Sequence, residues 1–322
     1  MLKRFVFIKE DQPEEAWLAR FVAGRAEAER WYLGAGHGEP PTAAECRMAL
    51  IEHMPELVAL YDRVCNLVGD DEMAHRILSH FRPPPAVAGC SQAIWLKDGG
   101  PALVRNYDYP LDIVSNRFEA TSWFGREVIS KGQRPWGGCT DGMNSEGLVA
   151  SLTFVGNDAR DRPGFSVILM LRYVLETCRD VGEAVAALSR IPIAMSHNVT
   201  LLDRSGAYAT LFLGPNREPK VTDALACANH QETVSTVAKS GKRQRAMTEA
   251  LNDPGMSLAR LTALFLEQPL YFRSAAFPTV YTAVYRPADG RVDYIWPGAC
   301  RTQYIGRFKA GEYVHDYGEL TR

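Results

Sequence analysis

The chain has 322 residues, of which 46% are hydrophobic and 23% are charged, and its formal net charge is -2. These values are typical of a globular protein with a sizeable core, and the near-neutral charge argues against binding to nucleic acid or to an anionic membrane. The apolar stretch at residues 5–8 is too short for a signal peptide, and no later run is long enough to span a membrane. We therefore expect a cytoplasmic protein.

The chain contains seven cysteines and no C-x-x-C pair. An odd number of widely spaced cysteines, without an export signal, predicts reduced thiols rather than a disulfide framework. No His, Cys or acidic residues show the spacing of metal ligands, and no glycine-rich phosphate-binding motif occurs. We therefore expect neither a metal nor a cofactor.

Residues 14–81 are expected to be helical. Thr42 is a suitable N-cap, with Glu45 as its capping-box partner, and a further helix is predicted over residues 73–81. Residues 82–89 then contain three consecutive prolines, which exclude a helix and predict an extended connection. This connection leads directly to Gly89-Cys90.

After Cys90 the pattern changes to strands. The first two should form a hairpin, residues 91–97 with 101–106, across the turn Asp98-Gly99-Gly100. The remaining predicted elements are strands at 117–124, 126–131 and 148–155, helices at 165–178 and 181–189, a hairpin of 198–202 with 207–213, helices at 241–252 and 257–267, and a hairpin of 280–285 with 291–296. This order favours an α+β fold, a four-layer αββα sandwich of two antiparallel sheets.

The first hairpin should bring Arg105 back beside Cys90. Arg105 and Asn106 must point to opposite faces of the strand, so only one of them faces inward. An arginine beside a thiol lowers the thiol pKa from about 8.5 and so increases the thiolate fraction. Taken singly, Arg105 is equally typical of a surface residue at the end of a strand.

Five segments together resemble a known superfamily. They are Gly89-Cys90 followed by R-N-x-D (105–108), TDGMNSEGLVASLTF (140–154), SHNVTLLDRSG (196–206), ACANHQ (226–231) and YTAVYRPADGRVDYIW (281–296). In this order they resemble the choloylglycine hydrolase, penicillin V acylase and penicillin acyltransferase relatives of the N-terminal-nucleophile (Ntn) hydrolases. The long helical segment before Cys90 resembles the acyl-CoA:6-aminopenicillanic acid acyltransferase branch, peptidase family C45.

The resemblance implies two parts, a helical propeptide at 1–89 and an αββα catalytic domain at 90–322. It also implies self-cleavage between Gly89 and Cys90, after which the propeptide stays bound as a small subunit. Because Gly89 has no Cβ, its peptide can adopt the strained geometry that thiol attack requires.

The resemblance also implies the roles of the site residues. Cys90 is the nucleophile, and its freed α-amino group, with a pKa near 7.7–8.0, is the base. Asp108 holds the α-amine, Arg105 supports the thiolate, and the oxyanion accepts from the Asn144 backbone N–H and the Asn229 side-chain amide. Arg243 in the segment SGKRQRA (240–246) best matches a further family arginine. Arg245 and a merely solvated basic helix start remain alternatives.

The implied function is cleavage or formation of a linear amide of a small acylated molecule through a Cys90 acyl-enzyme. Tyr107, Tyr109 and Trp123 either line an apolar pocket for the acyl group or belong to the core. The sequence leaves hydrolase, acyltransferase and a homo-oligomeric state open. A different class of function is also open, an unprocessed and non-catalytic binding protein on the same fold.

Overall fold

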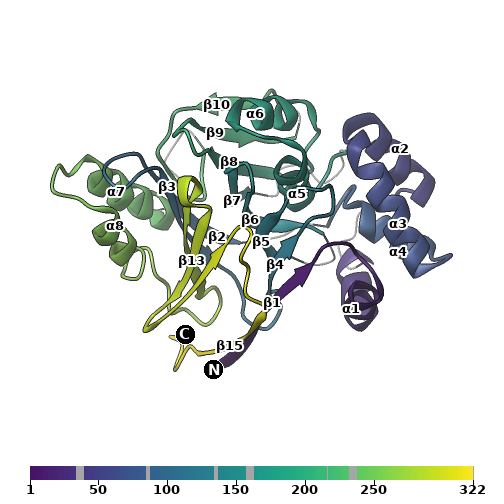
Figure 1. Cartoon of the computed structure of the whole chain (residues 1–322), viewed down its shortest axis with the longest axis horizontal. Helices are drawn as coiled ribbons and strands as arrows, with labels where there is room; N and C mark the ends of the chain where they lie inside the picture. The colour runs from purple at the N-terminus through teal and green to yellow at the C-terminus, as the bar shows by residue number, and fades with distance from the viewer. Residues whose placement is uncertain are drawn as a thin grey trace.

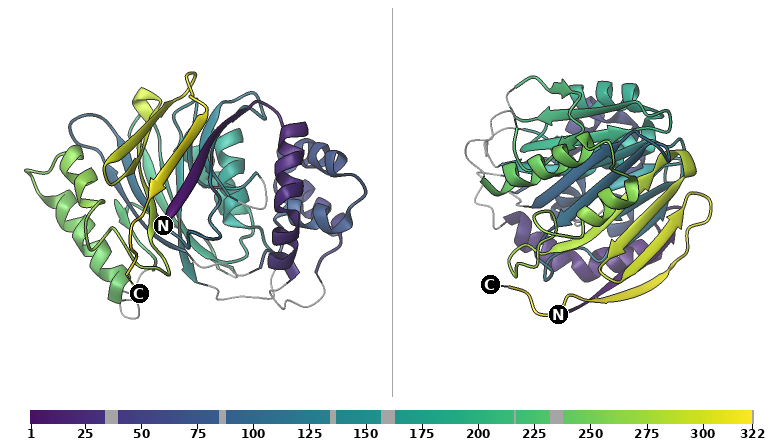
Figure 2. Two further views of the ribbon diagram at one scale, coloured as in Figure 1. Left: turned by 90° about the horizontal axis from the view of Figure 1, so that it is seen from below. Right: turned by 90° about the vertical axis from the view of Figure 1, so that its left-hand side faces the viewer.

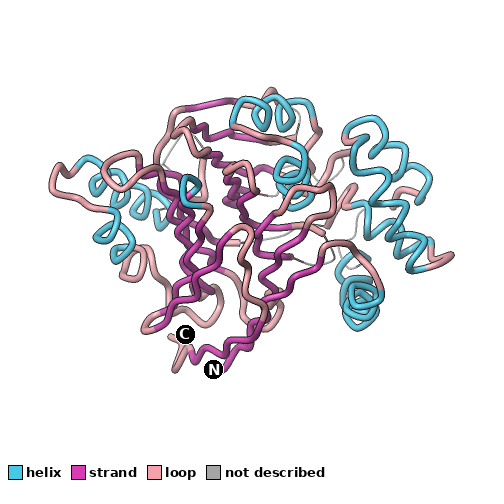
Figure 3. Tube along the Cα trace, viewed as in Figure 1, coloured by secondary structure: helices cyan, strands magenta, loops and turns pink. Residues whose placement is uncertain are grey.

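Two large β-sheets face each other in the computed structural model and carry helices on both outer faces (Figure 1). The structure describes residues 1–33, 40–84, 88–133, 137–156, 163–215, 217–231 and 238–321. The arrangement is the α+β sandwich expected from the order of elements (Figure 3). Within the described residues, no helix has both the length and the apolar character needed to cross a membrane.

The larger sheet has nine strands. Its order is β10 (Lys220–Thr222), β9 (Tyr208–Leu213), β8 (Ser196–Leu202), β7 (Val149–Gly156), β6 (Cys139–Asn144), β5 (Val128–Gly132), β4 (Arg117–Thr121), β1 (Leu2–Glu10) and β15 (Gly311–Asp316). Neighbouring strands are antiparallel except β1 and β4, which are parallel. The strand β1 therefore sits inside the sheet, with β4 on one side and β15 on the other.

The smaller sheet has six strands. Its order is β11 (Ala226–Cys227), β2 (Gly89–Trp95), β3 (Ala102–Asp108), β12 (Thr279–Arg286), β13 (Arg291–Trp296) and β14 (Ala299–Tyr304). The predicted hairpin is the pair β2–β3, whose turn places Gly99 and Gly100 at positive φ angles of 90° and 83°. Glycine adopts such angles without the steric cost that a Cβ brings.

The period of two along β2 assigns its side chains to two different cores. Ile94 belongs to the core between the sheets, whereas Ala93 and Trp95 pack beneath α7 (Ala238–Asn252) and α8 (Leu258–Leu264). On the opposite side of the molecule, α5 (Val167–Thr177) and α6 (Val181–Arg190) cover the outer face of the nine-stranded sheet. The four layers are therefore helices, sheet, sheet and helices.

The residues before Cys90 form more than the expected helices. The helices are α1 (Glu15–Leu33), α2 (Ala43–His53), α3 (Val58–Val68) and α4 (Glu72–Ser79), with a 3₁₀ turn at Pro55–Leu57. They pack outside α5 in one shared core, and the Thr42–Glu45 capping box is present. However, residues 2–10 are strand β1, which Figure 2 shows beside β15 and away from the helices. The segment is therefore not purely helical, because Phe5 and Phe7 alternate into the core between the sheets.

Candidate active site

Gly89 and Cys90 are the first two residues of β2. In the register of β2 and β3, Gly89 lies opposite Asp108 and Cys90 lies opposite Tyr107. Cys90 and Tyr107 point into the core between the sheets, where the Cys90 side chain is fully buried. Of the proline-rich connection before them, residues 85–87 lie outside the described residues.

The structure brings Arg105 to Cys90, because the two residues lie diagonally on the same face of the hairpin. An Arg105 guanidinium nitrogen, Nη2, lies 3.4 Å from Cys90 Sγ. The expected fall in the thiol pKa does not follow. Burial raises the pKa of Cys90 to about 11, and the opposing effect of the Arg105 charge is smaller. Cys90 is thus a neutral thiol at pH 7 in this structure.

A buried carboxylate that the sequence analysis did not assign holds Arg105 in place. Asp141 Oδ1 accepts from Arg105 Nη1 at 2.8 Å and from the Tyr281 hydroxyl at 2.5 Å, while Oδ2 accepts from the Tyr285 hydroxyl at 2.6 Å. Both charged side chains are completely buried. Asp141 comes from the nine-stranded sheet and these three donors come from the six-stranded sheet, so the cluster joins the two sheets at the site. Its sequence signal was the Asp of the D-G-M-N segment.

Asn229 contacts the backbone on both sides of Gly89. Its Oδ1 accepts from the Cys90 N–H at 3.0 Å, and its Nδ2 donates to the Ala88 carbonyl at 3.4 Å and the Phe154 carbonyl at 2.7 Å. The Asn229 backbone N–H donates to the Ser240 hydroxyl at 2.8 Å, which fixes this short segment against α7. An amide donor therefore lies beside the peptides on either side of Gly89.

Arg243 is the arginine of its segment that reaches the site, whereas Arg245 is exposed. Arg243 Nη1 donates to the Cys90 carbonyl at 2.6 Å and to the Ser91 hydroxyl at 2.9 Å, and Nη2 donates to Asn229 Oδ1. The guanidinium also forms an ion pair with Asp108 at 3.5 Å. Arg243 therefore connects the backbone of Cys90 with the side chains of Asn229 and Asp108.

Asp108 lies directly against Gly89. A Cβ added to Gly89 would lie 2.9 Å from Asp108 Cβ, so a larger residue does not fit without movement. The Asp108 carboxylate accepts from the Thr279 hydroxyl at 2.7 Å. Burial raises the pKa of Asp108 to about 6, although Arg243 and Thr279 act in the opposite direction. Asp108 can therefore change its charge near neutral pH.

Asn144 is not brought to Cys90, which corrects its expected role. Its backbone N–H donates to the Leu148 carbonyl within the β6–β7 turn, and its side-chain amide donates to the carbonyls of Leu175 and Cys178. The side-chain oxygen accepts from backbone N–H groups in the same turn. Asn144 thus fastens this turn to the end of α5, and its N–H is not available to an oxyanion.

A cavity of 370 Å³ adjoins the site, and Tyr107 and Tyr109 both line it. The two rings stack with centroids 5.5 Å apart. Trp123 does not line this cavity; it packs against the Arg172 guanidinium, 4.7 Å from its ring centre, among residues of α3 and α5. Of the two alternatives for Trp123, the structure therefore favours the core, because the turn after β4 places it in the outer core rather than between the sheets.

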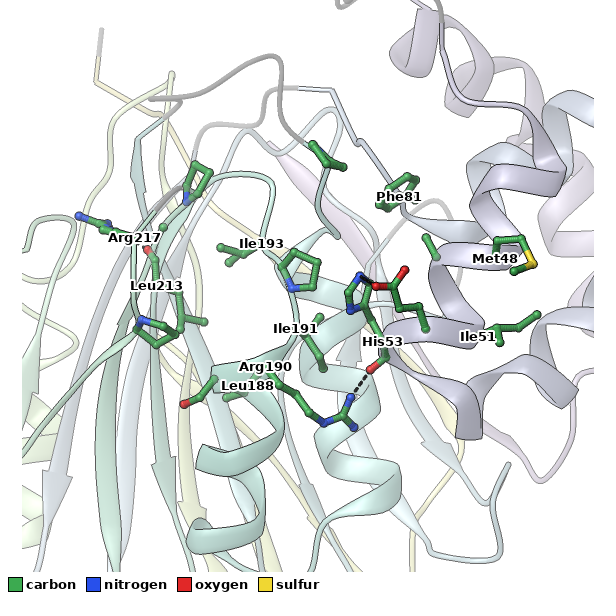
Figure 4. A pocket seen from close by; sticks show the side chains of 18 of the residues that line it. Met48, Ile51, His53, Phe81, Leu188, Arg190, Ile191, Ile193, Leu213 and Arg217 are labelled. Carbon is green, nitrogen blue, oxygen red and sulfur yellow. Dashed lines mark hydrogen bonds and ion pairs between the residues drawn. The ribbon is translucent and has the colours of Figure 1, made fainter.

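A second and larger hollow, of 1360 Å³, lies between α2 and the α6–β9 region (Figure 4). None of the predicted site residues lines it. Arg190 crosses beside it to donate to the His53 carbonyl, and thus ties α6 to α2. In the part of the chain that the structure describes, no group of three or more His, Cys, Asp or Glu residues could hold a metal ion.

Similarity to solved structures is distant. The chain is similar to a conjugated bile acid hydrolase from Clostridium perfringens (13% identity, TM-score 0.44, 72% of this chain and 99% of the other). It is also similar to penicillin V acylase from Agrobacterium tumefaciens (13%, 0.39, 67% and 86%) and to a Caenorhabditis elegans ortholog of N-acylethanolamine-hydrolyzing acid amidase (12%, 0.47, 71% and 100%). No curated protein matches the sequence.

A family model matches the sequence directly. The model of acyl-coenzyme A:6-aminopenicillanic acid acyl-transferase matches residues 95–300, more than half of the 322-residue chain. The match includes Arg105, Asp108, Asn229 and Arg243, which the structure gathers around Cys90. The chain therefore belongs to the acyl-coenzyme A:6-aminopenicillanic acid acyl-transferase family, as the resemblance of its motifs predicted.

Proposed function

We propose that the chain is an amide hydrolase or acyltransferase that cleaves itself between Gly89 and Cys90 and then acts through a Cys90 acyl-enzyme. The observation that carries the proposal is the convergence on one buried cysteine. Arg105 contacts its sulfur, Asn229 its backbone N–H, and Arg243 its carbonyl. These contacts come from three distant parts of the chain, as expected for a preorganised nucleophile.

Self-cleavage begins when the Cys90 sulfur attacks the Gly89 carbonyl carbon. A C–S bond forms, the Gly89–Cys90 peptide bond breaks, and the thiol proton passes to the Cys90 nitrogen. Water then opens the thioester, which leaves a Gly89 carboxyl group and a free Cys90 with an α-amine. The fit of Gly89 against Asp108 supports this route, because the Cα hydrogens of glycine leave the carbonyl open to attack.

Turnover uses the same sulfur with a new proton carrier. The α-amine, with a pKa near 7.7–8.0, takes the thiol proton as the sulfur attacks a substrate amide and then returns it to the leaving amine. Asp108 stands beside the position of this amine, and Asn229 supplies an amide donor for the oxyanion. Water completes hydrolysis, whereas an acceptor amine completes acyl transfer.

Cleavage also opens access to the site. Before cleavage the Cys90 side chain is fully buried, and the neighbouring cavity is bordered by Pro83, Pro84 and Ala88 of the connection. Release of the Gly89 carboxyl end frees Asn229 Nδ2 from the Ala88 carbonyl and lets a substrate take that place. The N-terminal segment remains bound as a small subunit.

The direct test compares wild-type protein, Cys90→Ala and Cys300→Ala. Intact mass should show two pieces divided at Gly89–Cys90 for the wild type, and the 35.8 kDa chain for Cys90→Ala. Amine release from a panel of N-acyl amides should be lost in Cys90→Ala and after alkylation of the wild type. Cys300 is exposed and distant, so Cys300→Ala should be processed and active.

Two results would contradict the proposal. One is turnover that persists in Cys90→Ala. The other is a wild-type chain that stays intact and releases no amine, which would support a non-catalytic binding protein instead.

A further inference from the structure

We propose that helix α1 forms the outer wall of the acyl-binding cavity and that Trp31 determines the size of the apolar acyl group. This inference rests on the proposed function and names the substrate class of the same site. It makes the N-terminal segment part of the substrate site rather than only a cover that cleavage releases.

The cavity beside Cys90 is built from both sides of the cleavage point. Helix α1 contributes four lining residues, Glu27, Ala28, Arg30 and Trp31. The other lining residues come from the connection and from the part of the chain after Cys90. Its volume of 370 Å³ lies at the lower end of the range for small-molecule sites, about 300–1,000 Å³. The cavity is incomplete without α1.

The position of the connection decides which half of an amide the cavity receives. Ala88 lies on the carbonyl side of the scissile bond, and it lines the cavity. Cys90 attacks its own peptide and a substrate amide with the same sulfur. The acyl half of a substrate should therefore lie where the residues before Cys90 lie. The cavity is therefore the acyl side of the site, and the leaving amine lies elsewhere.

The lining selects an apolar acyl group. Its inner part contains Leu152, Phe154 and Met195, which are all buried. At its outer edge, Trp31 is 38% exposed and Ile113 is 46% exposed, although large apolar side chains are normally covered. An apolar acyl chain that ends at this edge would cover part of both side chains and gain free energy in proportion to the area removed from water.

Charge at the outer edge does not favour an ionic group. Glu27 and Arg30, both exposed, carry opposite charges on the same turn of α1. Their fields oppose each other, so neither a carboxylate nor an ammonium at the far end of the acyl group is preferred. The predicted substrate therefore has an uncharged acyl chain or ring.

Packing holds the outer wall against the rest of the molecule: Ala28 and Tyr32, which are near Trp31 in α1, cluster with Ile77 of α4. Trp17 and Phe21, earlier in α1, stack at 5.4 Å and belong to the core shared with α5. The strand β1 just before α1 is paired on both edges. A fixed wall sets a limit on length, so removing the Trp31 ring should allow longer acyl groups.

The experiment measures kcat/KM of processed protein for amides of one amine with straight acyl chains from four to fourteen carbons. Trp31→Ala should raise the ratio of long-chain to short-chain kcat/KM by about tenfold, which corresponds to roughly two further buried methylenes. Leu33→Ala is the matched control, since Leu33 is 53% exposed on the same helix and does not line the cavity. Its profile should equal that of the wild type.

A binding measurement keeps the inference separate from the proposed function. Calorimetric titration with the straight-chain carboxylic acids, the hydrolysis products, reports on the cavity without turnover. Trp31→Ala should move the tightest binding to longer acids. An unchanged chain-length preference, in turnover or in binding, would overturn the inference, as would the failure of every acid to bind. Turnover that survives alkylation of Cys90 would refute the proposed function alone.

Discussion

At the residue scale, the charges around Cys90 form two opposed pairs. Arg105 faces the sulfur and is held by Asp141, while Arg243 faces the Cys90 carbonyl and is paired with Asp108. Each arginine is buried, and a buried charge is tolerated only when it is paired and hydrogen-bonded. The carboxylates are therefore as necessary for the geometry of the site as the arginines that touch Cys90.

This arrangement predicts that Asp141 is a positioning residue. Asp141→Asn removes a charge-assisted hydrogen bond from Arg105 and should reduce kcat/KM of processed protein roughly 10- to 100-fold. Burial is the main cause of the raised pKa of Cys90, and the negative charge of Asp141 raises it further, so removal of that charge should also shift the pH profile of Cys90 alkylation to lower pH.

The matched control is Asp203→Asn. Asp203, in the β8–β9 turn, is also a buried carboxylate, but it accepts from the Ser205 hydroxyl and from the Val181 N–H at the start of α6. Its substitution should leave the alkylation profile in place. An unshifted profile in Asp141→Asn would show that Asp141 acts only on stability.

At the scale of elements, β1 joins the N-terminal segment to the rest of the molecule. Both of its neighbours, β4 and β15, belong to the part after Cys90. Further links come from the Tyr173 hydroxyl, which donates to Glu56 at 2.7 Å. Cutting the chain at Gly89 breaks none of these interactions.

We therefore predict that the two pieces stay together after cleavage. They should co-elute in gel filtration and separate only in denaturant. Val6→Pro removes the hydrogen bond from the Val6 N–H to the Asn116 carbonyl inside the sheet, and should lower the free energy of unfolding by about 3 kcal/mol.

Leu2→Pro is the control for this substitution. Leu2 is the first residue of β1 and is largely exposed, so proline is tolerated there. Pieces that separate without denaturant in the wild type would contradict the prediction.

At the scale of the whole molecule, the buried site reduces stability near neutral pH. The pKa of Asp108 is raised by burial to about 6, from 3.8. Above pH 6 the folded protein must keep a buried charge that the unfolded chain exposes to water. The stabilising contribution of the protonated Asp108 carboxyl group is complete below about pH 4 and is lost as the pH rises through 6.

The effect of Asp108→Asn on the free energy of unfolding should therefore be more favourable at pH 8 than at pH 3.5, although the substitution also takes a partner from Arg243 at both pH values. In a Cys90→Ala background, which excludes cleavage, we expect the two effects to differ by about 1–3 kcal/mol in urea unfolding. Asp112→Asn is the control, because Asp112 is exposed on the loop that follows. An effect that is equal at both pH values would contradict this origin.

The local elements of the fold follow from local patterns. The hairpin β2–β3, the helices α5 and α6 and the hairpin β12–β13 lie where turn glycines and apolar periodicity predicted them. The strands β1, β6, β10, β14 and β15 were not predicted. A strand such as β1 gains its stability from partners more than 100 residues away, which no local pattern reveals.

The sequence by itself determined the family and the choice of Cys90 as the central residue of the site. It also determined the contact of Arg105 with Cys90, because a short hairpin fixes its own register. Only the tertiary structure decided between Arg243 and Arg245, removed Asn144 and Trp123 from the site, and added Asp141 and Trp31. These assignments depend on how two sheets and a helix pack, and the burial produced by that packing also raises the pKa of Cys90. Spacing along the chain carries no information on such burial.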